Sequence, residues 1–295
     1  MKNVPKPPDR AKRLCIDIGA TRLKCAVLPR PTNWEDLSGL QTDAMRILGW
    51  LNRSMEDLLN PRNGVALNHA RRQLPACDSI AIGLCTELDA SGKISGHLRG
   101  RGVPADLKER FERQTGKRVI LINDAEAWLR GALTYCELNP SKPGGSVAGK
   151  RSLALIFGTA VGWASGKDPK CVVPEEFNPG FKATHLSKAA GTNVDGWAVH
   201  RILGKPFFDW VARDKPDWSY PTIRKEFTRR VIALHKDIES LRGRPDTLFI
   251  GGGNAEYVSI REVEKSLGVP VIVLREPELE IPPDLVPLLG LASIC

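Results

Sequence analysis

The chain has no run of apolar residues long enough to span a membrane, so neither a transmembrane helix nor a membrane partner is expected. Residues 1–13, MKNVPKPPDRAKR, also lack the apolar stretch of a secretory signal peptide. Of the seven cysteines, none stands in CxxC or CxC spacing. Their scatter argues against a disulfide framework or a cysteine zinc site, and it favours a reduced, cytoplasmic setting.

Also missing are runs of lysine and arginine interleaved with aromatic residues, so a nucleic-acid partner is not expected. Lysine and arginine number 43 against 34 aspartates and glutamates, which gives a net charge of +9. Such a surplus fits an anionic ligand such as a nucleotide or polyphosphate. It fits a basic, solvated surface equally well.

What the sequence does contain is an alternation of apolar strands with helical patterns, which predicts an α/β protein. A chain of 295 residues can hold two domains of roughly 150 each. The stretch 139–150, rich in Pro, Gly and Ser, is the most linker-like. Strands are expected in hairpins at 13–29, 87–96 and 151–166 and singly at 79–85, 118–123, 247–250 and 269–274. Helices are expected at about 34–59, 104–116, 124–136, 193–204, 221–242 and 282–294, and a turn feeding a helix at 251–268.

An aspartate lies inside the first apolar strand, in LCIDIGATRLKCAVL (14–28). A buried carboxylate is costly unless a metal, a cation or hydrogen-bond donors accompany it. Asp17 is followed at once by small and hydroxylated residues, a turn that lets backbone N–H groups approach an anion. A carboxylate there would suit a hydrated Mg²⁺, which keeps several of its waters.

Four short segments share this chemistry, and each alone has a simpler interpretation. Gly-Ala-Thr and Gly-Thr-Ala are common hairpin turns, and an Asn-Asp pair between a strand and a helix commonly caps the helix. The glycine run is a possible strand-to-helix connection, and it does not fit the GxGxxG pattern of dinucleotide folds. The segments are DIGATRLK (17–24), IND (122–124), FGTAVG (157–162) and IGGGN (250–254).

Taken together in order and spacing, the four segments resemble the ROK group of sugar kinases, within the actin/hexokinase-like ATPase superfamily. The similarity extends from residue 13 to the final helix. It implies a two-domain α/β fold of the ribonuclease H-like type with an interdomain cleft. Residues 1–124 would form the N-terminal domain, with the C-terminal helix 283–295 packing back on it, and residues 125–282 would form the C-terminal domain.

The resemblance implies a glucokinase-like transfer of phosphate from ATP, or from polyphosphate, to a sugar hydroxyl, with glucose as the default acceptor. Asp124 would be the general base, and Asn123, Glu176 and His185 would bind the sugar. Mg²⁺ would be held through water by Asp17. The implied phosphate- and nucleotide-binding residues are Asp17, Gly19, Thr21, Lys24, Gly158, Thr159, Gly162, Gly251, Gly252 and Gly253.

The sequence departs from the family on the sugar side. Glu176, Gly180 and His185 are present, but not at the spacing of the family's Glu-x-Gly-His motif. The family's cysteine-rich zinc loop has no counterpart, because no cysteine lies between Cys171 and Cys295, so no structural zinc is expected. Members resembling polyphosphate glucokinases also lack this zinc. A surface-loop histidine is the simpler interpretation of His185.

Alternative functions stay open on the same fold. One is a catalytically silent protein that binds a sugar or nucleotide, and another is a phosphatase of the same superfamily. Relatives are often dimers, so a homodimer is possible, and five aromatic residues could serve either an interface or a core. These are Trp197, Phe207, Phe208, Trp210 and Trp218.

Overall fold

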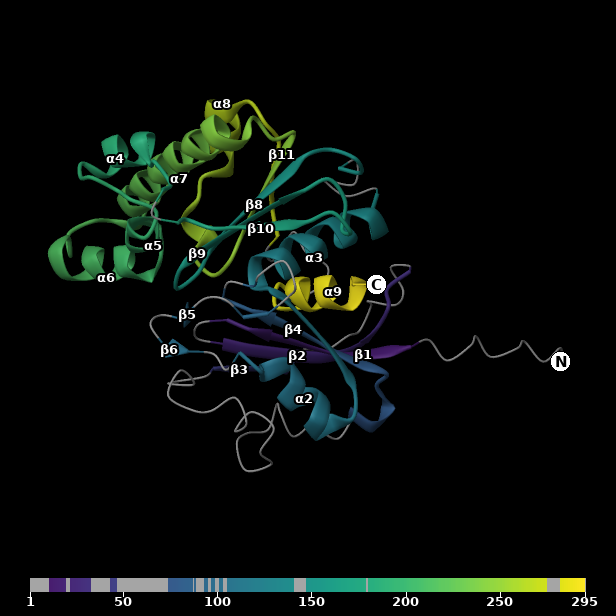
Figure 1. The fold of residues 1–295 in the computed structure, drawn as a ribbon. Helices are drawn as coiled ribbons and strands as arrows, with labels where there is room; N and C mark the ends of the chain where they lie inside the picture. Colours follow the sequence, from purple (N-terminus) through teal and green to yellow (C-terminus); the bar gives the residue numbers. More distant parts are fainter. Residues whose placement is uncertain are drawn as a thin grey trace. The chain divides into compact units, whose positions relative to one another are not determined.

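The chain folds as two compact units, Met1–Thr134 with Asp284–Cys295, and Tyr135–Pro283. Each unit contains a five-stranded sheet (Figure 1). The division falls within a helix that begins at the expected boundary, residue 124, and separate folding of two domains stays a prediction. The computed structural model describes residues 11–19, 22–32, 43–46, 74–86, 88, 93–94, 97–98, 101–102, 105–140, 147–178, 180–274 and 282–294.

The sheet of the first unit has the order β3-β2-β1-β4-β7. Strands β1, β2 and β3 pair antiparallel, and β4 and β7 extend the sheet parallel to β1. Residues 14–18 of β1 are all buried, so both faces of this central strand are covered. The bounds are β1 Lys12–Ile18, β2 Arg22–Pro29, β3 Asp43–Arg46, β4 Ser79–Leu84, β7 Arg118–Asn123, α2 Leu107–Thr115, α3 Asp124–Leu138 and α9 Leu285–Ser293, with a short pair β5 His97–Leu98 and β6 Arg101–Gly102 and a 3-10 turn η3 Leu74–Ala76.

The helix expected at about 34–59 is wrong at Asp43–Arg46, which is strand β3 and pairs antiparallel with β2. The backbone groups on the outer edge of β2 need partners, and this tertiary pairing overrides the helical spacing of the apolar residues. The remainder of that stretch lies outside the described residues.

The second unit repeats the pattern, with the order β10-β9-β8-β11-β12. Strands β8, β9 and β10 pair antiparallel, and β11 and β12 continue parallel to β8. The strand–turn–strand similarity seen in the sequence therefore extends to a whole sheet. The bounds are β8 Ser152–Phe157, β9 Val161–Gly166, β10 Val173–Glu175, β11 Thr247–Gly251, β12 Val271–Val273, α4 Thr184–Ala190, α5 Ala198–Leu203, α6 Lys205–Asp214, α7 Tyr220–Arg242, α8 Ile260–Leu267 and a 3-10 turn η4 Ala255–Tyr257.

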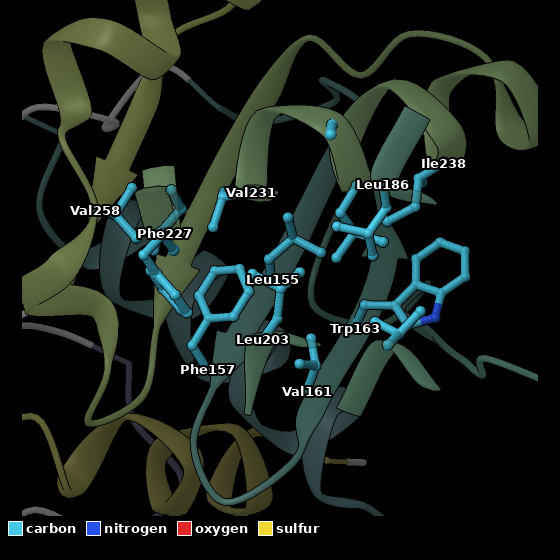
Figure 2. Close-up of a cluster of buried hydrophobic side chains, with 14 of the residues drawn as sticks. Leu155, Phe157, Val161, Trp163, Leu186, Leu203, Phe227, Val231, Ile238 and Val258 are labelled. Atoms are coloured by element: carbon cyan, nitrogen blue, oxygen red, sulfur yellow. The ribbon is translucent and has the colours of Figure 1, made fainter. Parts of the chain in front are cut away.

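The core of the second unit lies between the sheet and the helices that cover it (Figure 2). Phe157 at the end of β8 meets Phe227 of α7 edge to face, with ring centroids 5.4 Å apart. Trp163 of β9 is 1% exposed and stacks on Phe177 at 5.5 Å. Such burial removes large apolar surfaces from water, and it anchors the end of β8 where the second turn motif begins.

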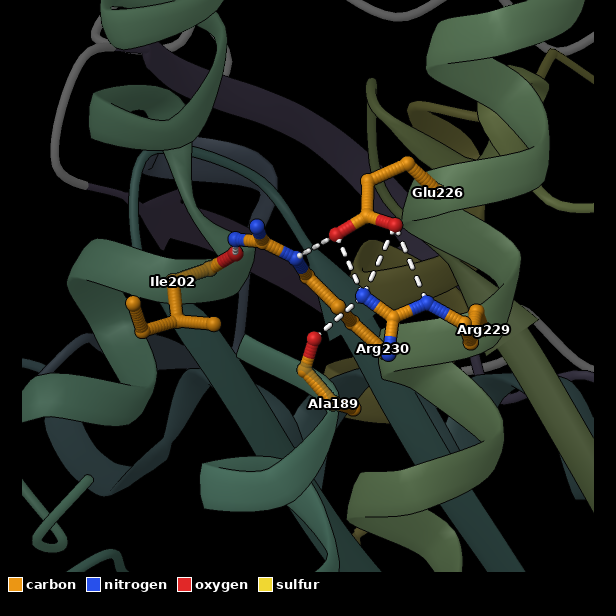
Figure 3. A network of polar contacts seen from close by, with 5 residues as sticks. All are labelled: Ala189, Ile202, Glu226, Arg229 and Arg230. Atoms are coloured by element: carbon orange, nitrogen blue, oxygen red, sulfur yellow. Dashed lines mark hydrogen bonds and ion pairs between the residues drawn. The ribbon is translucent and has the colours of Figure 1, made fainter. Parts of the chain in front are cut away.

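A charged network on α7 fastens the neighbouring helices (Figure 3). Glu226 accepts hydrogen bonds from both Arg229 and Arg230. Arg229 also donates to the carbonyl of Ala189 at the end of α4, and Arg230 to that of Ile202 in α5. Because Arg230 is 6% exposed, its charge needs this carboxylate, and the network therefore ties α4 and α5 to α7.

Helices α4 and α6 are additions to the elements expected from the sequence. The pattern at 170–192 predicts irregular structure, which is wrong at strand β10 and helix α4. Helix α6 begins with a proline in its first turn, a helix-start signal that is present in the sequence. The aromatic residues of α6 pack inside the unit: Phe207 is 1% exposed, and Trp210 meets Trp218 edge to face. Only Trp197 of the five candidate aromatics is largely exposed, at 56%. None of the helices in the described part of the chain is long and apolar enough to cross a membrane.

Candidate functional site

The buried aspartate of the first strand has a cationic partner. Asp17 lies opposite Lys24 in the β1–β2 register, and the Lys24 Nζ is 3.2 Å from its Oδ2. The same Nζ is 3.4 Å from Oδ1 of Asp284, the residue before α9. Burial lowers the pKa of Lys24, but the two carboxylates raise it more, so the net shift is upward. Lys24 is therefore charged at neutral pH, and its positive charge offsets the free-energy cost of burying the Asp17 carboxylate.

Asp124 lies at the same edge of this sheet, where β7 passes into α3. Gly83 of the intervening strand β4 separates it from Asp17. A Cβ at Gly83 would lie 3.4 Å from the Asp17 Oδ1 and 3.8 Å from the Asp124 Cα. Because Gly83 has no side chain, none lies between the carboxylates of Asp17 and Asp124, and the two groups interact electrostatically.

Burial raises the pKa of Asp124 to about 7, and the charge of Asp17 adds to this rise. The backbone N–H of Ala125, which donates to its Oδ1 at 2.8 Å, and the charge of Lys24 act in the opposite direction. A carboxylate with this pKa gains and loses a proton near neutral pH. That property suits a general base.

Asn123 has partners for both ends of its amide group. Its Oδ1 accepts from the backbone N–H groups of Ala125 at 2.8 Å and Glu126 at 3.4 Å, which is the geometry of a helix N-cap. Its Nδ2 donates to the carbonyl of Thr86 at 3.1 Å. The capping interpretation of the Asn-Asp pair is thus confirmed for Asn123, and Asp124 is the first helical residue beside it.

Magnesium fits this edge only as a hydrated ion. Within the described residues, no three His, Cys, Asp or Glu side chains cluster closely enough to hold a metal ion. The Asp17 Oδ1 lies 3.4 Å from the position of a Cβ at Gly83, and the Asp124 carboxylate is near enough for the charge of Asp17 to raise its pKa. Mg²⁺ retains several waters and needs one or two protein carboxylates, so this donor set is compatible with it.

In the second unit, the structure brings the two glycine-containing turns together. The turn Gly158–Ala160 joins β8 to β9, and Asn254 ends the glycine run after β11. The backbone N–H of Asn254 donates to the carbonyl of Phe157 at 2.9 Å, and its Nδ2 donates to the carbonyl of Gly158 at 2.9 Å. These contacts follow from topology, because β8 and β11 are parallel neighbours and end at the same edge.

In the run IGGGN, the backbone conformation requires glycine at position 252. Gly252 has φ of 86°, and a Cβ there would be 2.4 Å from the carbonyl oxygen of Phe157. At Gly253 a Cβ would meet nothing within 4 Å. Gly252 therefore allows the turn to lie against the end of β8.

The junction of α5 and α6 supports the Gly158–Ala160 turn from another direction. The N–H of Lys205 donates to the Thr159 carbonyl at 3.1 Å, and the N–H of Val161 donates to Nδ1 of His200 at 3.2 Å. Sequence reasoning missed Lys205 and His200, and it missed Asn254 as well. Asn254 directly follows the glycine run and could have been included, whereas His200 had no signal in the sequence.

The remaining candidate residues are more dispersed. Gly19 directly follows β1, Gly162 lies in β9 opposite Ile156, and Thr21 lies outside the described residues. Glu176 directly follows β10. None of the three described residues takes part in the hydrogen bonds and ion pairs given above for the two turns and the carboxylates.

His185 belongs to helix α4 and not to a loop, so the simpler interpretation is wrong about the loop, but the side chain lies at the surface as it expects, 47% exposed. Its Nδ1 is 2.8 Å from the Asp237 Oδ1, which also accepts the backbone N–H of His185 at 2.8 Å. The other oxygen of Asp237 accepts the N–H of Leu186 at 2.9 Å. Asp237 of α7 therefore caps α4 and orients the histidine ring.

No family model matches the chain, and no curated protein matches it in sequence. Solved structures do match it over nearly its whole length. A glucokinase from Balamuthia mandrillaris in complex with glucose has a TM-score of 0.63 at 14% identity, covering 96% of this chain and 93% of that one. A ROK family glucokinase from Streptomyces griseus in complex with glucose and AMPPNP has a TM-score of 0.56 at 16% identity, covering 96% and 97%.

An inorganic polyphosphate/ATP-glucomannokinase from Arthrobacter sp. strain KM matches with a TM-score of 0.56 at 18% identity, again covering 96% and 97%. The chain therefore has the α/β fold of ROK-family sugar kinases, which is actin/hexokinase-like. The resemblance drawn from the four motifs is confirmed for the fold.

Proposed function

We propose that this protein is a sugar kinase that transfers the terminal phosphoryl group of ATP, or of polyphosphate, to a sugar hydroxyl. Glucose is the default acceptor. Asp124 accepts the hydroxyl proton while the acceptor oxygen bonds to phosphorus and the bond to the leaving phosphate oxygen breaks. The products are a sugar phosphate and ADP, or a polyphosphate shortened by one unit.

The placement and acidity of Asp124 carry the proposal. It is a partly buried carboxylate at a strand-to-helix junction, and its pKa of about 7 results from burial and from Asp17. An aspartate of ordinary acidity would be a weaker base for an alcohol proton. General bases are most effective when their pKa lies near the working pH.

The turns of the second unit are the proposed contacts for the phosphate donor. Backbone N–H groups of small residues can approach an anion closely, as the turns Gly158–Ala160 and Gly251–Gly253 allow. Bound Mg²⁺ would neutralise phosphate charge, and Asp17 would hold it through water. His200, Lys205 and Asn254 would keep the turn in place through the hydrogen bonds described above.

A second candidate is a protein that binds a sugar or nucleotide without turnover. It is favoured by the internal partners of two implied sugar-binding residues. Asn123 caps α3 and binds the Thr86 carbonyl, and the His185 ring is engaged by Asp237. These bonds reduce the donors and acceptors that both side chains can offer to a sugar.

The test is a kinase screen of the purified chain with Mg-ATP and, separately, with Mg-polyphosphate. Hexoses, amino sugars and N-acylated sugars serve as acceptors, and sugar phosphate and ADP are measured. Asp124→Asn should lower turnover by about 10²–10⁴-fold, because the amide cannot accept the proton. Asp106→Asn is the matched control, since this exposed aspartate pairs with Arg110 on the remote helix α2.

Each outcome separates the candidates. Turnover of Asp124→Asn at the parental rate would show that the base assignment is wrong. Nucleotide or sugar binding by calorimetry without any turnover would support the silent binder. Orthophosphate released without any acceptor would instead indicate a phosphatase.

A further inference from the structure

We propose that Trp197 selects a nucleotide as the phosphate donor by stacking its exposed indole ring on the nucleobase. This inference rests on the proposed function, and it deepens that function by choosing between the two donors named there, ATP and polyphosphate. Polyphosphate has no base, so a residue that binds the base increases the affinity for the nucleotide alone.

Trp197 has the largest of the apolar side chains that the described part of the chain leaves exposed. The others are Val173, Tyr220 and Leu241, and the exposed fraction of Trp197 is 56%. Single apolar side chains at a surface are common, so exposure alone does not indicate a binding site. The position of the indole ring beside the proposed donor turn is the second observation that supports one.

The ring of Trp197 is connected to the Gly158–Ala160 turn through a single side chain, His200. The two rings meet edge to face, with centroids 6.2 Å apart. The Nδ1 of His200 accepts the N–H of Val161, the residue that follows the turn, at 3.2 Å. A nucleotide whose phosphates contact this turn carries its ribose and base only a few bonds away. Trp197 therefore provides an aromatic surface where a base can bind.

The backbone that carries the ring is held on both sides of Trp197. A Cβ at Gly196 would be 1.9 Å from the Asn178 carbonyl oxygen, so glycine allows these two segments to pack in direct contact. The Asp195 Oδ1 accepts the N–H of Ala198 at 2.8 Å. Because a tryptophan side chain has few rotatable bonds, a ring on such a backbone loses little conformational entropy when a base stacks on it.

Two alternatives compete with base stacking on Trp197. A sugar can also pack on an indole through its C–H groups, but the contact through His200 leads to the turn that would bind the donor, which favours the base. Tyr220 is the other exposed aromatic ring of the described residues. Its hydroxyl donates to the Glu256 carbonyl at 2.9 Å and its ring lies 5.4 Å from that of Tyr257, so it already has a structural role.

The experiment is calorimetry of the purified chain with Mg-ATP, with Mg-tripolyphosphate and, separately, with glucose. Trp197→Ala should weaken Mg-ATP binding by about 5- to 100-fold, the loss expected when a base loses its aromatic partner. Its affinities for Mg-tripolyphosphate and glucose should stay at the parental values. Trp197→Phe should retain most of the ATP affinity, because it keeps an aromatic face. Tyr220→Leu and Leu241→Ala, at the two ends of α7, are the controls and should bind as the parent does.

Indole fluorescence gives a second readout of the same contact. The emission of Trp197 is the difference between the parent and Trp197→Phe. Mg-ATP should quench this emission, and Mg-tripolyphosphate should leave it unchanged. If Trp197→Ala does not fold, this readout decides alone, and quenching by both donors or by neither would overturn the inference.

Equal weakening of both donors in Trp197→Ala would overturn the inference, because it would show that the ring only supports the turn through His200. An unchanged ATP affinity in Trp197→Ala, or a loss of ATP binding in Tyr220→Leu alone, would overturn it by showing that the base binds elsewhere. A loss confined to glucose would show that the ring binds the acceptor instead.

The same measurements separate this inference from the proposed function. Turnover with polyphosphate by a chain that does not bind ATP would overturn the role of Trp197 and leave the kinase proposal standing. ATP binding with the expected pattern but without turnover would refute the kinase proposal and leave the role of Trp197 standing. Binding of neither donor would overturn both.

Discussion

The two sheets of this protein have the same strand order and the same pattern of parallel and antiparallel pairing. At the turn end of the first hairpin, Asp17 faces Lys24. At the corresponding register of the second hairpin, Ile156 faces Gly162. The neighbouring parallel strand carries a glycine in both sheets, Gly83 beside Asp17 and Gly251 beside Ile156.

This difference shows that strand topology sets where a site can form and not what the site does. The first unit places ionisable side chains at the strand ends, which suits proton transfer. The second places an apolar pair there, and backbone groups of two turns gather instead, held by Asn254 and His200. Substitutions that remove a side-chain charge should therefore have the larger effects in the first unit, and substitutions that disturb the backbone should have the larger effects in the second.

The largest expected effect on stability tests the backbone of the second unit. Gly252→Ala should lower the free energy of unfolding by about 3 kcal/mol or more, because it adds strain at positive φ and a clash with the Phe157 carbonyl. Gly253→Ala should change it by about 0.5 kcal/mol or less, since its Cβ meets nothing within 4 Å. Urea unfolding measures both. Equal losses in the two variants would contradict the assignment.

A histidine in α7 tests whether the second unit contains an ionisable group whose titration changes the stability of the fold. His235 is buried, its ring nitrogens have no hydrogen-bond partner among the described residues, and burial lowers its pKa to about 4. As the pH falls from 6.5 to 4, the free energy of unfolding should decrease by about 3 kcal/mol, because His235 takes up a proton in the unfolded chain before it does so in the folded protein. His235→Leu should remove this slope in unfolding curves recorded at pH 7 and pH 4. A variant with the parental slope would refute the prediction.

The first unit should show a titration of opposite sign. Because the pKa of Asp124 is raised to about 7, ionising it costs stability as the pH rises from about 4 through 7. Asp124→Asn should therefore be more stable than the parent by about 2–4 kcal/mol at pH 8, the lower value allowing for solvent screening of a partly exposed carboxylate, and equal to it near pH 3. Thermal unfolding at both values measures this. A loss of stability at pH 8 would show that the carboxylate has stabilising partners beyond those described.

The smallest expected effect concerns the side chain that joins the two turns. Asn254→Ala should weaken nucleotide binding about 5-fold, because it loses the hydrogen bond from Nδ2 to the Gly158 carbonyl. Asn193→Ala, at an exposed position before α5, should bind as the parent does. Calorimetry with Mg-ATP compares them. Identical affinities would show that the turn keeps its shape without this bond.

Much of the fold was predictable because its signals are local. Period-two apolar residues predicted β1 and β8, and Gly116 predicted the end of α2, where it has φ of 66°. The prediction was wrong at Asp43–Arg46, where pairing with β2 outweighs helical spacing. Helix α4 was missed because its capping carboxylate, Asp237, is supplied by α7 and not by a neighbour in the sequence.

The candidate site divides in the same way. Asp17 and Lys24 are opposite each other through a short hairpin, so their pairing follows from local register. Asp284 joins them from far along the chain, placed by the packing of α9 on β1, β2 and β4 and by its glycine contact with α3. His200 reaches the Gly158–Ala160 turn through packing of α5, which no spacing in the sequence reveals.

Residue order by itself determined the α/β class, the two hairpins with their turns, and the carboxylate at the start of α3, because each depends on neighbours within a few positions. Tertiary structure alone decided that Asp284 shares Lys24 with Asp17 and that the pKa of Asp124 lies near neutral. The physical reason is that desolvation and charge–charge interaction depend on distance in space, and the groups concerned come from strands β1 and β2, the start of α3 and the residue before α9.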